Sequence, residues 1–196
     1  MSLVDRAKGI LMNPKNEWAV IDTEPATVGS LYSGYIIPLA AIPAVARFIG
    51  MSLIGFSVLG FRVRMPVGSG LTSAVVAYVL GLVGVFVLAL IIDALAPSFG
   101  GQKSQIQALK VAGYSMTASW VAGIFLVIPS LAILAALGGL YGLFLLFLGL
   151  PILMKAPQEK AVGYTVVVII VAIVLYLVIG LVVRSVVPYP LPGLTP

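Results

Sequence analysis

The chain has 196 residues, 61% of them hydrophobic and only 9% charged, whereas soluble domains carry about 25% charged residues. A soluble fold of this size could not hide so much apolar surface, so lipid must surround much of the chain. The net charge of +5 would suggest nucleic acid in a soluble protein. Here the basic residues lie between long apolar runs, so they indicate orientation in a membrane instead.

The sequence contains no Cys and no His, which excludes disulfides, thiolate nucleophiles, His-based acid–base catalysis and the commonest transition-metal ligands. It also lacks a phosphate-binding loop and a dinucleotide-binding fingerprint. Of the six carboxylates, only Asp93 falls within a predicted span. We therefore expect no enzymatic activity, no metal and no cofactor.

Residues 1–30 are predicted to form an amphipathic segment at the cytoplasmic surface of the membrane. Five apolar residues share one helical face: Leu3, Val4, Ala7, Ile10 and Leu11. The Asn-Pro pair at 13–14 is typical of the start of a second short helix. Trp18 should face the membrane surface at headgroup depth, and Arg6 and Lys8 complete the interfacial anchor. The segment either senses or shapes the cytoplasmic leaflet, or it lies beneath the bundle and only covers helix ends.

Apolar runs of about 20 residues are long enough to cross a bilayer, and five are expected. They lie at about 33–60, 71–96, 109–128, 131–154 and 161–183. The apolar stretch 109–154 must fold back, because one helix of that length would measure roughly 70 Å. Pro129-Ser130 is the preferred turn, and Gly138-Gly139 is the competing one. If the chain turns at Pro129, the two glycines mark a kink or a point of close packing.

The distribution of basic residues predicts the orientation of the bundle, which we assign to residues 31–185. Without Arg47, one side carries Arg6, Lys8, Lys15, Lys103, Lys110, Lys155 and Lys160, against Arg62, Arg64 and Arg184. The positive-inside rule then places the N-terminus in the cytoplasm. The Pro-rich tail 186–196 is expected outside, extended and poorly ordered.

Arg47 and Asp93 are predicted inside the membrane, where a central charge costs about 2.5–3.5 kcal/mol on insertion scales. They form a candidate polar site coupled to protons or ions, or a structural charge pair, or Asp93 simply reaches the interface. Their expected backbone depths differ by more than about 10 Å, which argues against direct pairing.

Small residues recur at four-residue spacing, which lets helix backbones approach closely. The candidate packing positions are Ala46, Gly50, Ala77, Gly81, Gly138 and Gly142. Such faces serve packing within the bundle or the association of identical copies.

Several motifs resemble the bacterial branch of the Yip (Ypt/Rab-interacting protein) domain family. They are the residues at 13–14 with Trp18, then 31–35, 113–115, 138–142, 148–151 and 155–165. The resemblance implies five spans, a cytoplasmic N-terminus and an external C-terminus. Eukaryotic members act in early secretory trafficking, bind small GTPases and one another, and influence membrane shape. Their longer N-terminal region has no counterpart in these residues, so GTPase binding is not carried over, and the family offers no catalytic residues.

Taken together, these patterns favour a non-enzymatic, multi-pass protein of the bacterial inner membrane that acts as a membrane-organising or scaffold protein. Its expected partners are membrane lipids, further copies of itself and other membrane proteins, but not nucleic acid. The alternative is a small solute or ion transporter or channel that uses Arg47 and Asp93. A water-filled polar cavity around these two residues would favour transport, and a dry, packed bundle would favour the scaffold.

Overall fold

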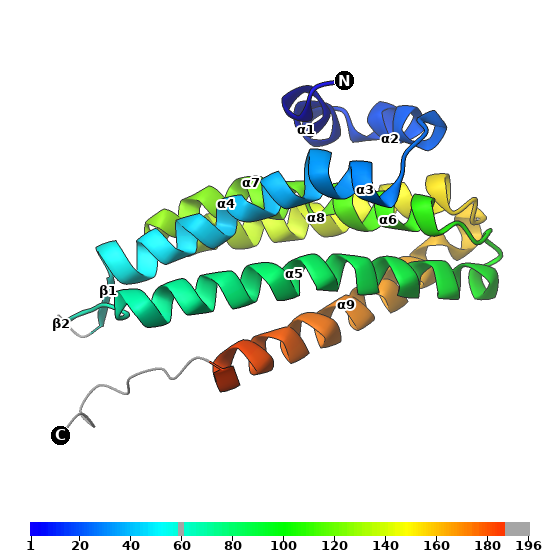
Figure 1. The fold of residues 1–196 in the computed structure, drawn as a ribbon. Coiled ribbons are helices and arrows are strands. Elements are labelled where there is room, and N and C mark those ends of the chain that lie inside the picture. The colour runs from blue at the N-terminus through cyan, green and yellow to red at the C-terminus, as the bar shows by residue number, and fades with distance from the viewer. Residues whose placement is uncertain (59–60, 187–196) are drawn as a thin grey trace.

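Five helical segments of the computed structural model are long and apolar enough to cross a membrane, which confirms the all-α, five-span fold (Figure 1). The structure describes residues 1–58 and 61–186, so almost all of the predicted tail lies outside the described residues. The five segments are Val28–Ile54, Val67–Phe99, Gln105–Val127, Pro129–Leu153 and Gln158–Val186.

The first segment alternates between helical types. It consists of α3 (Val28–Leu31), the π-helical η1 (Tyr32–Ile36), α4 (Ile37–Phe48) and the π-helical η2 (Ile49–Ile54). The N-cap Thr27 and Ser30 exchange hydrogen bonds and fix the start of α3, as in a capping box. Pro43 lies inside α4, where it removes one backbone donor and favours a bend.

A short hairpin follows the first segment, which ends at Ile54 rather than near residue 60 as predicted. Strand β1 (Phe56–Val58) pairs antiparallel with β2 (Phe61–Val63). Gly55 joins the helix to the hairpin. Its φ is +79°, and a Cβ there would lie only 2.7 Å from the Val63 carbonyl oxygen of β2. Both the positive φ and the close approach require glycine there. The sequence analysis did not predict this hairpin.

The second and third segments run antiparallel and pack together. The second consists of α5 (Val67–Leu95) and the 3₁₀ turn η3 (Ala96–Phe99). The third consists of α6 (Gln105–Ser115), α7 (Thr117–Ala122) and the 3₁₀ stretch η4 (Gly123–Val127). Its α-helical hydrogen bonding is interrupted at Met116, whose N–H bonds to the Gly113 carbonyl instead of one residue further back.

The fold-back between the third and fourth segments lies where the sequence predicted it. Ile128 is extended, and the short η5 (Pro129–Leu131) leads into α8 (Ala132–Leu153). Gly138 and Gly139 lie within α8, so the competing turn is wrong. The last segment is the single helix α9 (Gln158–Val186).

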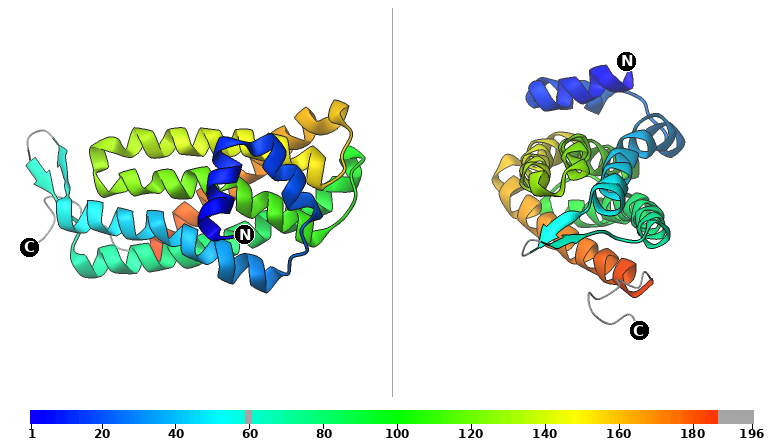
Figure 2. Two further views of the ribbon diagram at one scale, coloured as in Figure 1. Left: turned by 90° about the horizontal axis from the view of Figure 1, so that it is seen from above. Right: turned by 90° about the vertical axis from the view of Figure 1, so that its left-hand side faces the viewer.

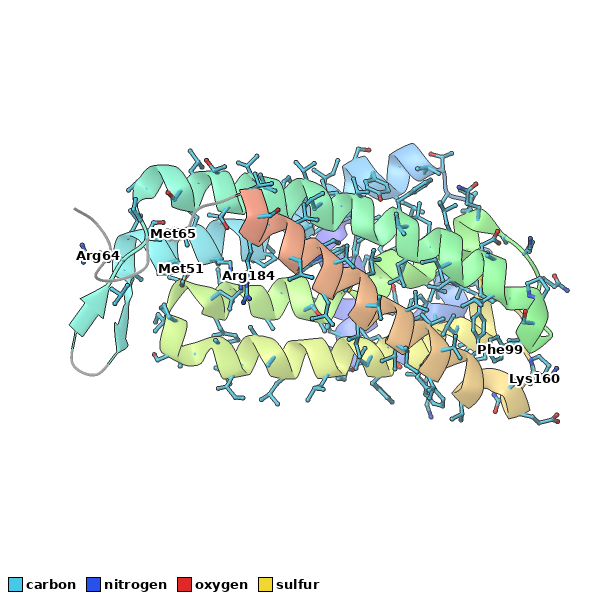
Figure 3. The ribbon with its side chains drawn as sticks, turned by 90° about the horizontal axis from the view of Figure 1, so that it is seen from below. Met51, Arg64, Met65, Phe99, Lys160 and Arg184 are labelled. Carbon is cyan, nitrogen blue, oxygen red and sulfur yellow. The ribbon has the colours of Figure 1, made fainter. Side chains whose placement is uncertain are left out.

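The two ends of the bundle differ in the elements they carry. Figure 3 shows Met51, Arg64 and Met65 at one end, here called the hairpin end, and Phe99 and Lys160 at the other. The latter, called the N-terminal end, also holds the connections after η3 and α8. Helix α5 packs against both α6 and α9, and α7 and α6 pack against α8. Helix α9 crosses the bundle obliquely on the side opposite the N-terminus (Figure 2).

Two short helices precede the spans. They are α1 (Leu3–Met12) and α2 (Pro14–Thr23), here called the N-terminal helical pair. The pair lies on one flank of the bundle, over the half farther from the hairpin (Figure 2). Helix α2 contacts α8, and α1 contacts α7. The pair therefore covers the side of the spanning helices rather than only their ends.

Candidate functional site

The structure does not bring Arg47 and Asp93 together. Arg47 lies near the end of α4, beside Ala74 near the start of α5, whereas Asp93 lies near the opposite end of α5. Nineteen residues of helix separate Ala74 from Asp93, which corresponds to about 28 Å along the axis. A direct charge pair is therefore excluded by geometry.

Asp93 has a local structural partner. Its carboxylate Oδ1 accepts a hydrogen bond from the backbone N–H of Ser104 at 2.6 Å. Ser104 is the N-cap residue of α6, and its own side chain accepts from Gln107 N–H. The carboxylate thus fixes the loop between the second and third segments, near the end of α5 rather than at its middle.

Arg47 borders a small cavity between α4, α5 and α7. The cavity has a volume of about 160 Å³, and its walls are mostly small or aromatic residues, including Ala77, Tyr78 and Trp120. No ion pair of Arg47 is found within the described residues. Little in this lining could hold a continuous file of water or ions.

Trp18 lies at the centre of the contact between the N-terminal helical pair and the bundle. Its side chain is fully buried, and its indole ring stands edge-on to Tyr114 at a centroid distance of 6.3 Å. A Cβ on Gly149 of α8 would lie only 2.7 Å from the indole, so glycine provides the notch. The prediction that Trp18 faces the membrane surface is therefore wrong. An amphipathic face has the same pattern whether lipid or protein covers it.

Arg6 is also buried rather than exposed at the membrane surface. Its guanidinium forms ion pairs with the carboxylates of Glu17 and Glu24 and lies 5.8 Å from the centroid of the Tyr114 ring. Removal from water is tolerated because each charge has an opposite charge within hydrogen-bonding reach. Of the predicted anchor residues, Lys8 alone is exposed on the outer face of α1.

Residues of the third segment complete this cluster. Lys110 donates from Nζ to the carbonyl oxygens of Ile21 at 2.8 Å and Glu24 at 2.6 Å. Its ammonium group therefore binds the end of α2 and the turn that follows it. We call this cluster the N-terminal clasp, and define it by Arg6, Glu17, Trp18, Glu24, Lys110 and Tyr114.

Further hydrogen bonds hold the pair at both ends. Gln107 donates to the backbone and side-chain oxygens of Asp22, and Lys155 forms an ion pair with the same carboxylate. The phenol of Tyr141, in the middle of α8, donates to the carbonyl oxygen of Leu11 at 2.8 Å. The helical pair is thus attached to α6, to α8 and to the loop after α8.

Sequence reasoning missed most of the clasp. Glu17, Glu24 and Tyr114 were not singled out, and Lys110 was counted only for orientation. The available signal was that five of the six carboxylates lie outside the predicted spans, four of them within the first 24 residues. Such a concentration beside basic residues indicates local ion pairing, but the sequence does not say which charges meet.

A polar pocket of about 380 Å³ opens beside the clasp. Arg6, Glu24, Ser30, Lys110 and Tyr114 line it. Its charges already have partners, because both cations are bound to groups of residues 17–24. Within the described ranges, no group of three or more His, Cys, Asp or Glu residues could hold a metal ion.

The small residues predicted for packing occupy different surroundings. A Cβ on Gly50 would lie 2.1 Å from the Leu126 carbonyl oxygen, and one on Gly138 would lie 2.7 Å from that of Ala118. Gly142 likewise faces the backbone of Ser115 at 2.9 Å. Ala46 is buried within the bundle. Ala77 and Gly81 instead border the cavity beside Arg47, and a Cβ on Gly81 would meet no atom within 4 Å.

Comparison with known proteins places these features in context. The sequence profile of the Yip1 domain matches residues 8–180. The chain is 30% identical over 162 residues to "Inner membrane protein YohC" of Escherichia coli K12, and the alignment covers 80% of this chain and 83% of that protein. The YohC protein of Escherichia coli O6:H1 matches to the same extent. No solved structure matches the chain significantly.

Proposed function

Because this chain belongs to the Yip1 domain family, we propose that it is a non-enzymatic, membrane-organising protein whose N-terminal helical pair acts as a wedge in one leaflet. The name of its Escherichia coli relative supports a location in the bacterial inner membrane. The basic residues gathered at the N-terminal end support a cytoplasmic N-terminus. The wedge would then widen the protein in the cytoplasmic leaflet.

The observation that carries this proposal is the attachment of the helical pair to one half of the bundle. One attachment point on α8, Gly149 against Trp18, lies in the half nearer the N-terminal end, and the other, Tyr141, which binds Leu11, lies at the middle of the helix. Tyr141 lies twelve residues from Leu153, the end of α8, or about 18 Å along the helix. A bilayer has a hydrocarbon core of about 30 Å, so the pair reaches from the N-terminal end to about the middle of the membrane and adds cross-section mainly to one leaflet.

The outer face of the pair suits the boundary between headgroups and acyl chains. Val4 and Met12 are 55% and 84% exposed, and they alternate with the exposed charges of Asp5, Lys8 and Lys15. Mixed apolar and basic faces of this kind lie in the plane of the interface. The clasp keeps this face in one position relative to the spans, so lipids meet a rigid wedge.

Transport through Arg47 and Asp93 has less support. The two charges do not form one polar site, because about 28 Å of α5 separates Asp93 from Ala74, which lies beside Arg47. Asp93 already serves the Ser104 backbone, and the cavity at Arg47 is small and mostly apolar. Arg47 itself is exposed on α4 rather than enclosed in a polar cavity, which favours the organising role.

Curvature sorting in giant vesicles tests the wedge. The full-length protein, fluorescently labelled, is reconstituted with a defined orientation, and a narrow tube is pulled outward from each vesicle. The outer leaflet of that tube is convex. Protein whose N-terminal end lies in the outer leaflet should be enriched in the tube relative to the vesicle, because its wider half then occupies the expanded leaflet.

The opposite orientation is a matched control made of the same protein. It should be depleted from the tube, so the effect must change sign. A Trp18→Ala variant, whose helical pair is loosened from the bundle, should sort more weakly than a Trp18→Phe variant. Equal density in tube and vesicle for both orientations would refute the wedge.

A further inference from the structure

An apolar groove lies between α5, α6, α8 and α9. It has a volume of about 430 Å³, and most of its lining is aliphatic, including Leu88, Leu146 and Ile169. Ile173 and Leu177 belong to its rim and are 55% and 63% exposed. These residues lie on a membrane-spanning helix, so the groove opens sideways to the lipid. Small-molecule pockets commonly have volumes of about 300–1,000 Å³ with a few polar groups in an apolar lining.

Three hydroxyl groups line this groove. Ser115 is 4% exposed, and its Oγ has no hydrogen-bond partner within the described residues. Ser119 lies one helical turn further along the same wall. Among the described residues, the phenol of Tyr176 on α9 donates only to the Met116 sulfur, at 3.8 Å, and a thioether is a weak acceptor. Buried hydroxyl groups normally have a partner, so the unsatisfied Ser115 points to a missing acceptor.

The groove is built into the packing of the third and fourth segments. A Cβ on Gly142 would lie 2.9 Å from the Ser115 carbonyl oxygen, and one on Gly139 would lie 3.9 Å from Ser119 Oγ. These glycines thus let α8 approach the segment that carries Ser115 and Ser119, and they leave room for the groove beside it. The interruption at Met116 lies on this wall as well, and breaks within a helix are frequent at functional positions.

Depth limits what the missing acceptor can be. Ser115 lies six residues inside the apolar part of the third segment, which begins near residue 109, or about 9 Å along the axis and within the hydrocarbon region. Charged and zwitterionic headgroups are strongly disfavoured at that depth. A neutral carbonyl group satisfies both the hydroxyl donors and the apolar surroundings.

The donors come from two elements that face each other across the groove, α6–α7 and α9. A flat ring with one carbonyl at each edge can accept from both walls at once, whereas the carbonyls of a glyceride lie at one end of the molecule. We propose that this groove binds a lipophilic quinone, with its ring between Ser115 and Tyr176 and its chain along the aliphatic lining.

Photoaffinity labelling tests the proposal with the full-length protein in phosphatidylcholine nanodiscs. The probe is an azido-substituted ubiquinone with a short tail, and the labelled peptides are identified by mass spectrometry. We expect labels on the peptides that contain Ser115–Ser119 and Tyr176, and we expect excess decylubiquinone to remove them. Two results would overturn the proposal. One is labelling spread over lipid-exposed α5 residues such as Val75 and Val79, and the other is labelling that excess decylubiquinone does not remove.

Two variants sharpen the test. Gly139→Leu places a side chain into the groove from a position where a Cβ fits, and labelling should fall about tenfold or more if the ring is excluded. Ser115→Ala leaves the shape intact and should reduce labelling about fivefold, the effect of one average hydrogen bond. Gly180→Leu is the matched control, because a Cβ there meets no atom within 4 Å.

Labelling of Gly139→Leu at the wild-type level would contradict the groove as the binding site. If dioctanoylglycerol competes with the probe as strongly as decylubiquinone does, the occupant of the groove is not a quinone. Neither result depends on curvature sorting, so the quinone site and the wedge can fail independently.

Discussion

Replacing Trp18 by alanine is the most direct perturbation of the N-terminal clasp. The indole is fully buried and contacts the notch at Gly149 and the edge of Tyr114. Alanine leaves a cavity where α2 meets α8, at the place where the helical pair joins the hydrophobic core of the spans. We expect the helical pair to detach while the bundle stays folded.

The size of the effect follows from the buried volume. Replacing a buried aromatic residue by alanine typically costs about 3–5 kcal/mol. A detached pair lies on the bilayer surface, where its apolar face recovers part of the burial, so the lower end of the range, about 3 kcal/mol, applies. That corresponds to an opening equilibrium shifted by roughly 100-fold.

Hydrogen exchange followed by mass spectrometry measures this opening in nanodiscs. Amides of α1 and α2 in Trp18→Ala should exchange roughly 100-fold faster than in the wild type, with α9 unchanged. Trp18→Phe is the control. It keeps most of the ring and removes the indole Nε1–H, which is buried without a partner among the described residues. Removing an unsatisfied donor offsets the lost area, so phenylalanine should exchange nearly as the wild type does.

Two results would refute the reasoning. If Trp18→Ala exchanges like the wild type, Trp18 does not hold the pair on the bundle. If exchange rises equally in α1, α2 and α9, the clasp is part of the global core, and the helical pair is not a separable unit.

Three further predictions concern other contacts. Arg6→Leu leaves the buried Glu17 without its cation and should destabilise the docking of the helical pair on the bundle by about 3–5 kcal/mol. Hydrogen exchange in α1 and α2 measures this loss. If the double variant with Glu17→Leu shows no recovery, the ion pair is not the cause. Gly138→Ala forces a Cβ toward a backbone oxygen of α7 and should destabilise the bundle by about 1–3 kcal/mol in thermal unfolding, whereas Gly180→Ala, with open space around it, should not. Ser2, the N-cap residue of α1, donates from its hydroxyl to the Asp5 carboxylate and thereby lowers the pKa of Asp5. The first turn of α1 should therefore keep this stabilisation at neutral pH and lose it as pH falls through the lowered pKa; exchange rates there that are independent of pH, after correction for intrinsic exchange, would contradict this.

The spans and the fold-back were predictable because they depend on lengths and composition. An apolar run must match the bilayer thickness, so the stretch 109–154 had to turn, and Pro129 supplied the break. The family resemblance rested on local motifs that the profile match over 8–180 confirms. None of these inferences required knowledge of which helix lies beside which.

The tertiary structure alone decided what the polar residues do. The sequence showed that Arg6 and Trp18 lie on an amphipathic segment, but an apolar face fits lipid and protein equally well, and only the notch at Gly149 selects protein. Asp93 was recognisable as an intramembrane charge, yet its partner is a backbone N–H eleven residues away. Sequence by itself determined how often the chain crosses the bilayer, because hydropathy and thickness are one-dimensional quantities. The positions of its charges and hydroxyl groups relative to one another depend on packing between distant segments, which sequence patterns do not encode.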